Sequence, residues 1–120
     1  MVEGFMTGNV PFITATVENK KNILDIIFTL DTGFTEDLLV TPEIASELEL
    51  DSENFSELYV ANGEKVTLNF TNANAIMEGS NKKIQVLISN GIPLLGIGFL
   101  TKFGYKAIVD CKERTVVLEN

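Results

Sequence analysis

The triplet Asp31-Thr32-Gly33 directly follows a mainly apolar run, residues 23–30, and this arrangement constrains the fold more than any other feature. β-Branched and aromatic side chains are enriched in the run, which predicts a β-strand. A carboxylate at the end of a buried strand needs hydrogen-bond partners, because an ionised group near an apolar core is otherwise costly. The triplet occurs once, and the chain has no Asp-Ser-Gly. Chemistry that needs two such carboxylates must therefore take the second one from another chain.

The composition excludes several classes of function. The chain has no histidine, which rules out histidine-dependent zinc sites and Ser/His or Cys/His catalysis. Nine basic residues against seventeen acidic ones give a net charge of −8, which argues against binding to nucleic acid. The single cysteine, Cys111, excludes an internal disulfide and fits a reducing compartment, and we expect it to be a small buried side chain.

The chain carries no sign of export or of membrane insertion. Its first residues lack a basic segment before an apolar stretch, so we expect no signal peptide. No apolar run approaches the length that spans a membrane. We therefore expect a cytoplasmic protein with no membrane partner.

Short strands dominate the predicted organisation of the 120 residues, which we expect to form one domain, 1–120. Thr41-Pro42 predicts the start of a short helix, with Thr as N-cap and Pro at the first helical position. A second short helix is expected to run to Phe103, with Gly104 closing it. The strands are expected at 10–17, 23–30, 38–40, 72–78, 83–89, 106–110 and 115–118, with a hairpin over 58–70. This spacing predicts a mainly β fold, a small closed β-barrel with one or two short helices.

Asn62-Gly63 is the strongest hairpin signal, because both residue types tolerate the positive φ of a type I′ turn. That turn places Val60 opposite Lys65 and Tyr59 opposite Val66. A second turn is expected at residues 79–81.

Three features follow one another along the chain: the strand that ends in Asp31-Thr32-Gly33, the hairpin with a glycine at its tip, and Leu94-Leu95-Gly96 before a short helix. This order and spacing resemble the retropepsin-like aspartic proteases, the single-domain group that includes retroviral proteases and their cellular and prokaryotic relatives. The resemblance is to a prokaryotic-type member, and it extends from about Val10 to the end of the chain.

The resemblance implies a role for each matching position. Asp31 is the expected catalytic carboxylate, Thr32 is expected to donate hydrogen bonds across a two-fold axis, and the N–H of Gly33 to bond the carboxylate. The hairpin over 59–68 is the expected flap, closing over an extended peptide, and the segment 94–96 is expected to pack beneath the catalytic loop. The expected substrate-binding residues are Phe34, Tyr59, Val60, Ala61, Asn62, Gly63 and Ile92.

Three features depart from the family pattern. The segment Thr35-Glu36-Asp37 lacks the acidic residue that retroviral members place directly after position 34, so the ion pair usual there is not implied. Phe34 stands where retroviral members usually carry Ala. Gly98 replaces the polar residue that the family places in the short helix.

The chemistry that the resemblance implies needs two copies of the chain. Two carboxylates within hydrogen-bonding distance cannot both ionise cheaply, so the pair shares a proton. The ionised partner takes a proton from a bound water, and the protonated one polarises the scissile carbonyl. The leading hypothesis is a homodimeric aspartic endopeptidase that uses Asp31 from each chain, without metal or organic cofactor, on peptide or protein substrates.

Other interpretations fit the same residues. The triplet can be a plain strand-end turn, since Asp and Gly are common turn formers. The fold can also be a dimeric module that binds peptides or partner strands without cleaving them, or a structural domain that stays monomeric.

Overall fold

The computed structural model describes residues 1–51, 54–59 and 61–120, and more than half of the chain is β-strand. The strands are β1 (Val2–Glu3), β2 (Phe5–Thr7), β3 (Val10–Asn19), β4 (Asn22–Leu30), β5 (Leu38–Val40), β6 (Asn54–Tyr59), β7 (Lys65–Met77), β8 (Ser80–Ile88), β9 (Leu94–Leu95), β10 (Lys106–Asp110) and β11 (Thr115–Glu119). The helices within these residues are α1 (Pro42–Glu47) and α2 (Ile97–Phe103). The prediction of a mainly β fold with short helices is confirmed.

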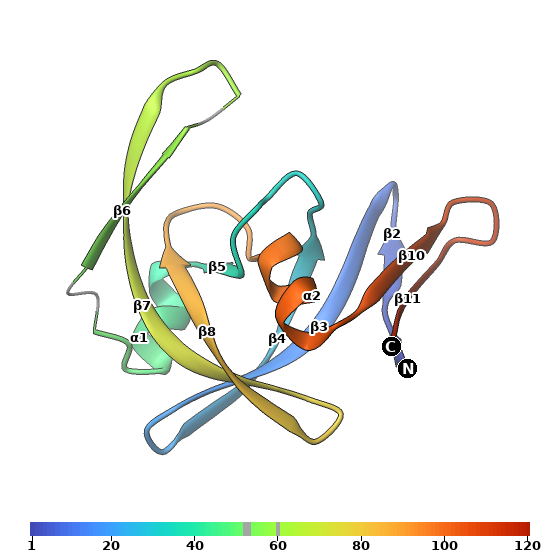
Figure 1. The fold of residues 1–120 in the computed structure, drawn as a ribbon, viewed down its shortest axis with the longest axis horizontal. Helices are drawn as coiled ribbons and strands as arrows, with labels where there is room; N and C mark the ends of the chain where they lie inside the picture. Colours follow the sequence, from blue (N-terminus) through green and yellow to red (C-terminus); the bar gives the residue numbers. More distant parts are fainter. Residues whose placement is uncertain (52–53, 60) are drawn as a thin grey trace.

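The larger sheet has the strand order β2-β3-β4-β9-β5-β8-β7-β6, and β3 pairs with β7 as well. This additional pairing joins β3, β4, β9, β5, β8 and β7 into a ring (Figure 1). The pairs β4–β9 and β5–β8 are parallel. The pairing of β4 with β9 brings the end of β4 next to the segment that leads into α2. A smaller sheet, β1-β11-β10, lies beside the ring, with both chain ends close together (Figure 1).

The core lies inside the ring and follows from the alternation of side chains along the strands. On β4, Phe28 is fully buried, whereas its neighbour Ile27 is exposed. Helix residues complete the core, with Leu48 after α1 and Phe99 in α2 both fully buried. Apolar side chains from distant parts of the sequence therefore fix where the ends of β4 and β9 lie.

α1 begins and α2 ends at the predicted residues. The Oγ1 of Thr41 accepts a hydrogen bond from the N–H of Ile44 at 3.3 Å, and Pro42 opens α1. Gly104, at φ 69°, terminates α2, because glycine adopts the left-handed conformation without a Cβ penalty.

The predicted register of the β6–β7 hairpin is wrong by one residue. Tyr59 pairs with Lys65, not with Val66, and Leu58 pairs with Val66. Asn62 does not form a type I′ turn. Its Oδ1 instead accepts a hydrogen bond from the N–H of Glu64 at 2.9 Å, a side-chain turn that lengthens the connection.

The next hairpin is tighter and longer than predicted. β7 runs without interruption from Lys65 to Met77, so the expected break near residue 71 is absent. The turn consists of Glu78 at φ 49° and Gly79 at φ 81°, between the pair Met77 and Ser80. Two successive residues at positive φ match the right-handed twist of the strands, as a type I′ turn requires.

The two strands at the N-terminus, β1 and β2, were not predicted. Both are too short for a periodic signal and form by pairing, β1 with β11 and β2 with β3. The N-terminal ammonium donates to Oε2 of Glu78 at 2.6 Å, and the hydroxyl of Tyr105 donates to Oε1 at 2.7 Å. These two bonds, that of the ammonium first, lower the pKa of the Glu78 carboxyl. Burial, and then the bond to Glu78, raise the pKa of Tyr105.

The expectation that Cys111 is buried is wrong. Cys111 is exposed in the turn between β10 and β11, where Asp110 Oδ1 accepts hydrogen bonds from the N–H groups of Lys112 and Glu113. The Asp110 side chain organises this turn, and the turn projects the residues between the strands into solvent.

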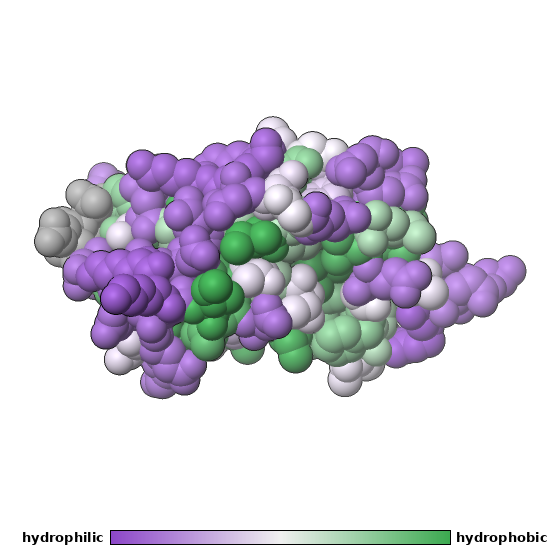
Figure 2. All heavy atoms as spheres, turned by 90° about the horizontal axis from the view of Figure 1, so that it is seen from below, coloured by the Kyte–Doolittle hydropathy of each residue, from purple (hydrophilic) through white to green (hydrophobic). Residues whose placement is uncertain are grey.

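The surface is largely hydrophilic, as expected for a net charge of −8. The face in Figure 2 has an apolar patch at its centre with hydrophilic side chains on either side. In the described part of the chain, no helix is long and apolar enough to cross a membrane.

Candidate active site

Asp31 is fixed by the backbone at the point where β4 ends. The buried Leu30 pairs with Leu95 of β9, and the N–H of Asp31 donates to the carbonyl of Leu95 at 3.0 Å. Asp31 itself is half-buried, and Thr32 and Gly33 are exposed. A rigid strand end thus presents a carboxylate at the boundary between core and solvent.

The loop after Asp31 folds back on the carboxylate. The N–H of Gly33 donates to Oδ1 of Asp31 at 2.9 Å, and the N–H of Phe34 donates to the Asp31 carbonyl at 3.1 Å. A Cβ at position 33 would stand 3.3 Å from Oδ1, so glycine allows this close approach. The bond expected for Gly33 is therefore present, and no described residue donates a hydrogen bond to the other carboxylate oxygen, Oδ2.

The segment between β9 and α2 lies against this loop. Three of its N–H groups donate to loop carbonyls: Gly96 to Asp37 at 2.9 Å, Ile97 to Phe34 at 2.9 Å and Gly98 to Glu36 at 3.1 Å. A Cβ on Gly96 would overlap with the carbonyl oxygens of Phe34 and Glu36. The expectation that residues 94–96 pack against the catalytic loop agrees with these contacts.

One residue at the end of the loop was missed by the sequence analysis. Asp37 is 4% exposed, and its Oδ2 accepts hydrogen bonds from the N–H of Gln85 at 2.8 Å and from the ammonium of Lys102. A charged residue directly before an apolar strand was the only local signal. Its partners lie 48 and 65 residues away in the sequence, so the pairing could not be predicted.

The other predicted site residues are not gathered around Asp31 in the single chain. Phe34 is half-buried, with its ring against Gly96, and Ile92 is 61% exposed on the loop before β9. Tyr59 is 76% exposed at the end of β6, and Ala61, Asn62 and Gly63 are exposed at the hairpin tip. Val60 lies outside the described residues. The hairpin projects from the body, and its tip stands apart from the loop between β4 and β5 (Figure 1).

The groups at this loop limit its chemistry. Lys102 forms an ion pair with Asp37 at the end of this loop, and not with Asp31. The described residues contain no cluster of three or more His, Cys, Asp or Glu that could hold a metal ion. A lone carboxylate can accept a proton from water, but it needs a second acid to polarise a carbonyl.

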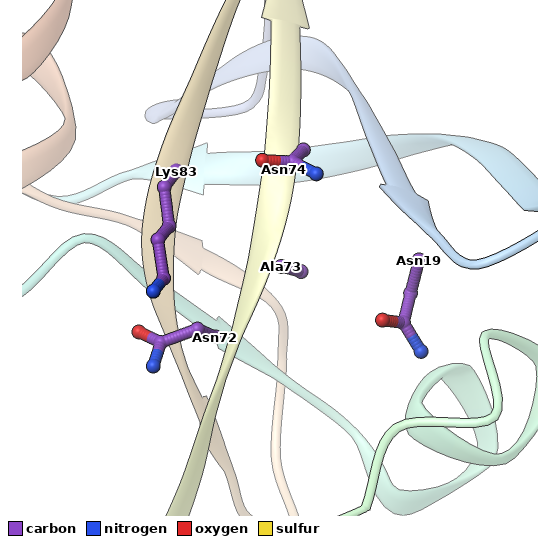
Figure 3. A pocket seen from close by; sticks show the side chains of 5 residues that line it. All are labelled: Asn19, Asn72, Ala73, Asn74 and Lys83. Atoms are coloured by element: carbon purple, nitrogen blue, oxygen red, sulfur yellow. The ribbon is translucent and has the colours of Figure 1, made fainter.

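The surface hollows lie elsewhere. One of about 160 Å³ is lined by residues of β3, β7 and β8, namely Asn19, Asn72, Ala73, Asn74 and Lys83 (Figure 3). The amide of Asn19 donates to the carbonyls of Leu48 and Glu49 at 2.9 and 3.1 Å, so it serves to attach the end of α1 to β3. The residues that line this hollow include neither Asp31 nor another carboxylate.

Comparisons with known proteins resolve the fold. No model of a known protein family and no curated protein matches the sequence. Among solved structures, the crystal structure of a retropepsin-like aspartic protease from Rickettsia conorii aligns with a TM-score of 0.66 and 21% identity, over 98% of this chain and 87% of that one. EIAV protease, in complex with the inhibitor HBY-793, aligns with a TM-score of 0.64 and 18% identity, over 86% of this chain and 99% of that one.

The fold is retropepsin-like. The likeness to the two proteases concerns the arrangement of the chain, and it agrees with the resemblance drawn from the sequence. In this retropepsin-like fold, Asp31 lies at the end of β4 and is bonded to the carbonyl that precedes Gly96.

Proposed function

We propose that this chain is a homodimeric aspartic endopeptidase, one domain over residues 1–120, in which Asp31 of each copy supplies one catalytic carboxylate. One observation carries the proposal. A half-buried carboxylate is held by backbone hydrogen bonds at a strand end in a retropepsin-like fold, and one of its oxygens is left without a donor from the described residues.

The need for a second copy follows from the count of groups at the site. Each chain has one Asp-Thr-Gly triplet, and histidine is absent. Thr32 and Gly33 are exposed beside the carboxylate, so this surface is open to a symmetric partner. A two-fold axis through the loop would place the two Asp31 side chains together, with each Thr32 donating to the opposite loop.

The reaction then follows from shared protonation. Two adjacent carboxylates hold one proton between them. The ionised carboxylate accepts a proton from water as the hydroxyl adds to the peptide carbonyl carbon, and the protonated carboxyl donates to the carbonyl oxygen. As the intermediate collapses, the C–N bond breaks, one carboxyl gives its proton to the leaving amine and the other carboxylate takes the proton of one of the intermediate's two hydroxyls. The pair is then left with its single shared proton.

An extended peptide is the substrate that this geometry favours. The hairpin of β6 and β7 projects with Tyr59 and the tip residues exposed, as a flap requires before it closes over a bound strand. Phe34 lies within the loop and Ile92 on the separate loop before β9, and both would line the adjoining pockets. Val60 is included in this proposal as a flap residue.

The test is cleavage of an unfolded protein mixture from acidic to neutral pH by wild type, Asp31→Asn and Asp25→Asn. Asp25 is an exposed carboxylate on the same strand, bonded to Oγ1 of Thr16 at 2.6 Å, so its variant makes the same chemical change away from the loop. We expect Asp31→Asn to lower kcat/KM by about 10²- to 10⁴-fold and Asp25→Asn to leave it nearly unchanged. A transition-state-mimicking aspartic protease inhibitor should abolish the wild-type cleavage.

Full activity of Asp31→Asn would contradict the proposal. A dimer that binds extended peptides and cleaves none would also contradict it, and would instead support the non-catalytic peptide-binding module.

A further inference from the structure

Among the residues that the structure describes, Asp37 is the one charged residue that is buried. It lies at the far end of the loop that begins with Asp31. We propose that Asp37 is a positioning residue for Asp31, and that its carboxylate replaces, from the loop side, the polar side chain that is missing from α2 at Gly98. This inference rests on the proposed function, because it assigns to Asp37 a part in aligning the catalytic carboxylate.

The contacts of Asp37 join every segment that surrounds the loop. Its Oδ2 accepts from the N–H of Gln85 in β8 and from the ammonium of Lys102 in α2. Its carbonyl accepts from the N–H of Gly96, which begins the turn into α2. One residue thus connects β8, the β9–α2 junction and the body of α2.

Gly98 provides the space for this carboxylate. A Cβ at position 98 would overlap with Oδ1 of Asp37 and would also stand 3.0 and 3.1 Å from the carbonyl carbon and oxygen of Glu36, to which the N–H of Gly98 donates. A side chain at position 98 and the Asp37 carboxylate therefore compete for one volume. The chain fills that volume from position 37, which explains why α2 can carry a glycine where the family pattern has a polar residue.

The loop is held at both ends by these bonds. At the start of the loop, the N–H of Asp31 donates to the carbonyl of Leu95. At its end, the Asp37 carboxylate accepts hydrogen bonds from Gln85 in β8 and Lys102 in α2. The residues between them, 32–36, receive the remaining bonds from Ile97 and Gly98. Without the Asp37 carboxylate, the loop keeps its backbone bonds to Leu95, Gly96, Ile97 and Gly98 but loses its side-chain bonds to β8 and to Lys102, and we expect the Asp31 turn to be less ordered.

The ion pair suits a positioning role because only one of its partners is buried. The Asp37 side chain is 6% exposed and that of Lys102 is 45% exposed. A buried carboxylate needs donors, and here a backbone N–H and a partly solvated ammonium supply them. Removal of the carboxylate leaves Lys102 free to extend into water but takes the acceptor from the N–H of Gln85, so we expect Asp37→Ala to fold with reduced stability.

The experiment compares Asp37→Ala, Gly98→Asp and the double variant that carries both changes. The carboxylate introduced by Gly98→Asp starts from the helix side of the same space, one helical turn before Lys102, a spacing that favours an ion pair. Asn19→Ala is the matched control. It removes two hydrogen bonds at the end of β3 that pairs with the start of β4, and Asp31 follows the opposite end of β4, about 30 Å along that strand. The change therefore destabilises the fold without touching the loop.

We expect Asp37→Ala to lower kcat about tenfold or more, with KM nearly unchanged, because the substrate pockets stay and the alignment of the carboxylates is lost. Gly98→Asp alone should lower kcat as well, since two carboxylates then compete for one volume. The double variant should recover part of the lost kcat, because the Asp37 carboxylate no longer competes for the space while the Cβ at position 98 still meets the Glu36 carbonyl. Asn19→Ala should lower the melting temperature and leave kcat as in wild type.

Backbone amide exchange at Gly33 and Phe34 gives a readout that does not need activity. Both N–H groups bond Asp31, so their protection reports the order of the turn. We expect protection to fall in Asp37→Ala, to return in the double variant and to persist in Asn19→Ala.

The inference is overturned if Asp37→Ala keeps kcat and amide protection at wild-type values, or if the folded double variant behaves like Asp37→Ala. If the proposed function is wrong, the experiment gives a different result. Wild type and Asp31→Asn would then be equally inactive, while amide exchange would still decide whether Asp37 holds the Asp31 turn.

Discussion

At the residue scale, carboxylates in this chain have distinct tasks that their partners assign. Asp31 is bonded by one backbone N–H at a solvent-facing turn, whereas Asp37 is buried and bonded from two other elements. Glu78 accepts bonds from the N-terminal ammonium and from Tyr105, and so attaches the start of the chain to the turn between β7 and β8. The donors around each carboxylate, more than its residue type, decide what it does.

The pairing of Glu78 predicts a dependence of stability on pH. Its folded-state pKa is lowered from the ordinary value of 4.5, mainly by the ammonium and then by Tyr105. The stabilisation is therefore present above that ordinary value and is lost as the pH falls through the lower, folded-state pKa. We expect wild type to exceed Glu78→Gln in unfolding free energy at neutral pH, and the difference to shrink on acidification below 4.5.

Urea unfolding of both proteins at a series of pH values measures this difference. Glu47→Gln, which removes the same charge from an exposed position in α1, is the control. A gap between wild type and Glu78→Gln that does not change with pH would contradict the assignment.

At the scale of elements, the junction between β9 and α2 supports the Asp31 loop. Gly96 lies in extended backbone, at φ −108°, which any residue adopts, so glycine is needed there for space alone. The oxygens of Phe34 and Glu36 occupy the volume that a side chain would fill. These are backbone atoms and cannot move aside without shifting the loop.

Gly96→Ala is therefore expected to reduce stability by about 1–3 kcal/mol, through overpacking, and to lower cleavage strongly. Gly104→Ala at the other end of α2 is the matched control. Its Cβ would meet open space, and the left-handed φ of 69° alone makes the change cost about 1–2 kcal/mol. Thermal unfolding and kcat/KM of the two variants test this, and equal loss of activity in both would contradict a specific role for the junction.

Elements with local signals were predicted from the sequence, and elements that depend on distant partners were not. The strand before Asp31, the Thr41 cap and the Gly104 terminus follow from neighbouring residues. The predicted β6–β7 register was wrong by one residue because the Asn62 side chain accepts a hydrogen bond from the N–H of Glu64, which a two-residue turn does not include. β1 has two residues and exists by pairing with β11, more than a hundred residues away, and Asp37 likewise depends on Gln85 and Lys102.

At the scale of the whole molecule, the proposed function makes each chain half of a site. The retropepsin-like arrangement places one carboxylate at an exposed loop, with a projecting hairpin and no described basic partner for Asp31. The proposed reaction takes one Asp31 carboxylate from each of two copies. It requires that the activity depend on pairs of intact chains.

The most direct measurement mixes wild type with Asp31→Asn at varied ratios and constant total concentration, after the subunits have exchanged. With random pairing, about a quarter of the dimers in an equal mixture keep both carboxylates. We expect cleavage to fall as the square of the wild-type fraction, while the sedimenting species remains a dimer throughout. Cleavage that falls linearly with the wild-type fraction would show that one chain suffices, and would contradict the shared pair of Asp31 carboxylates.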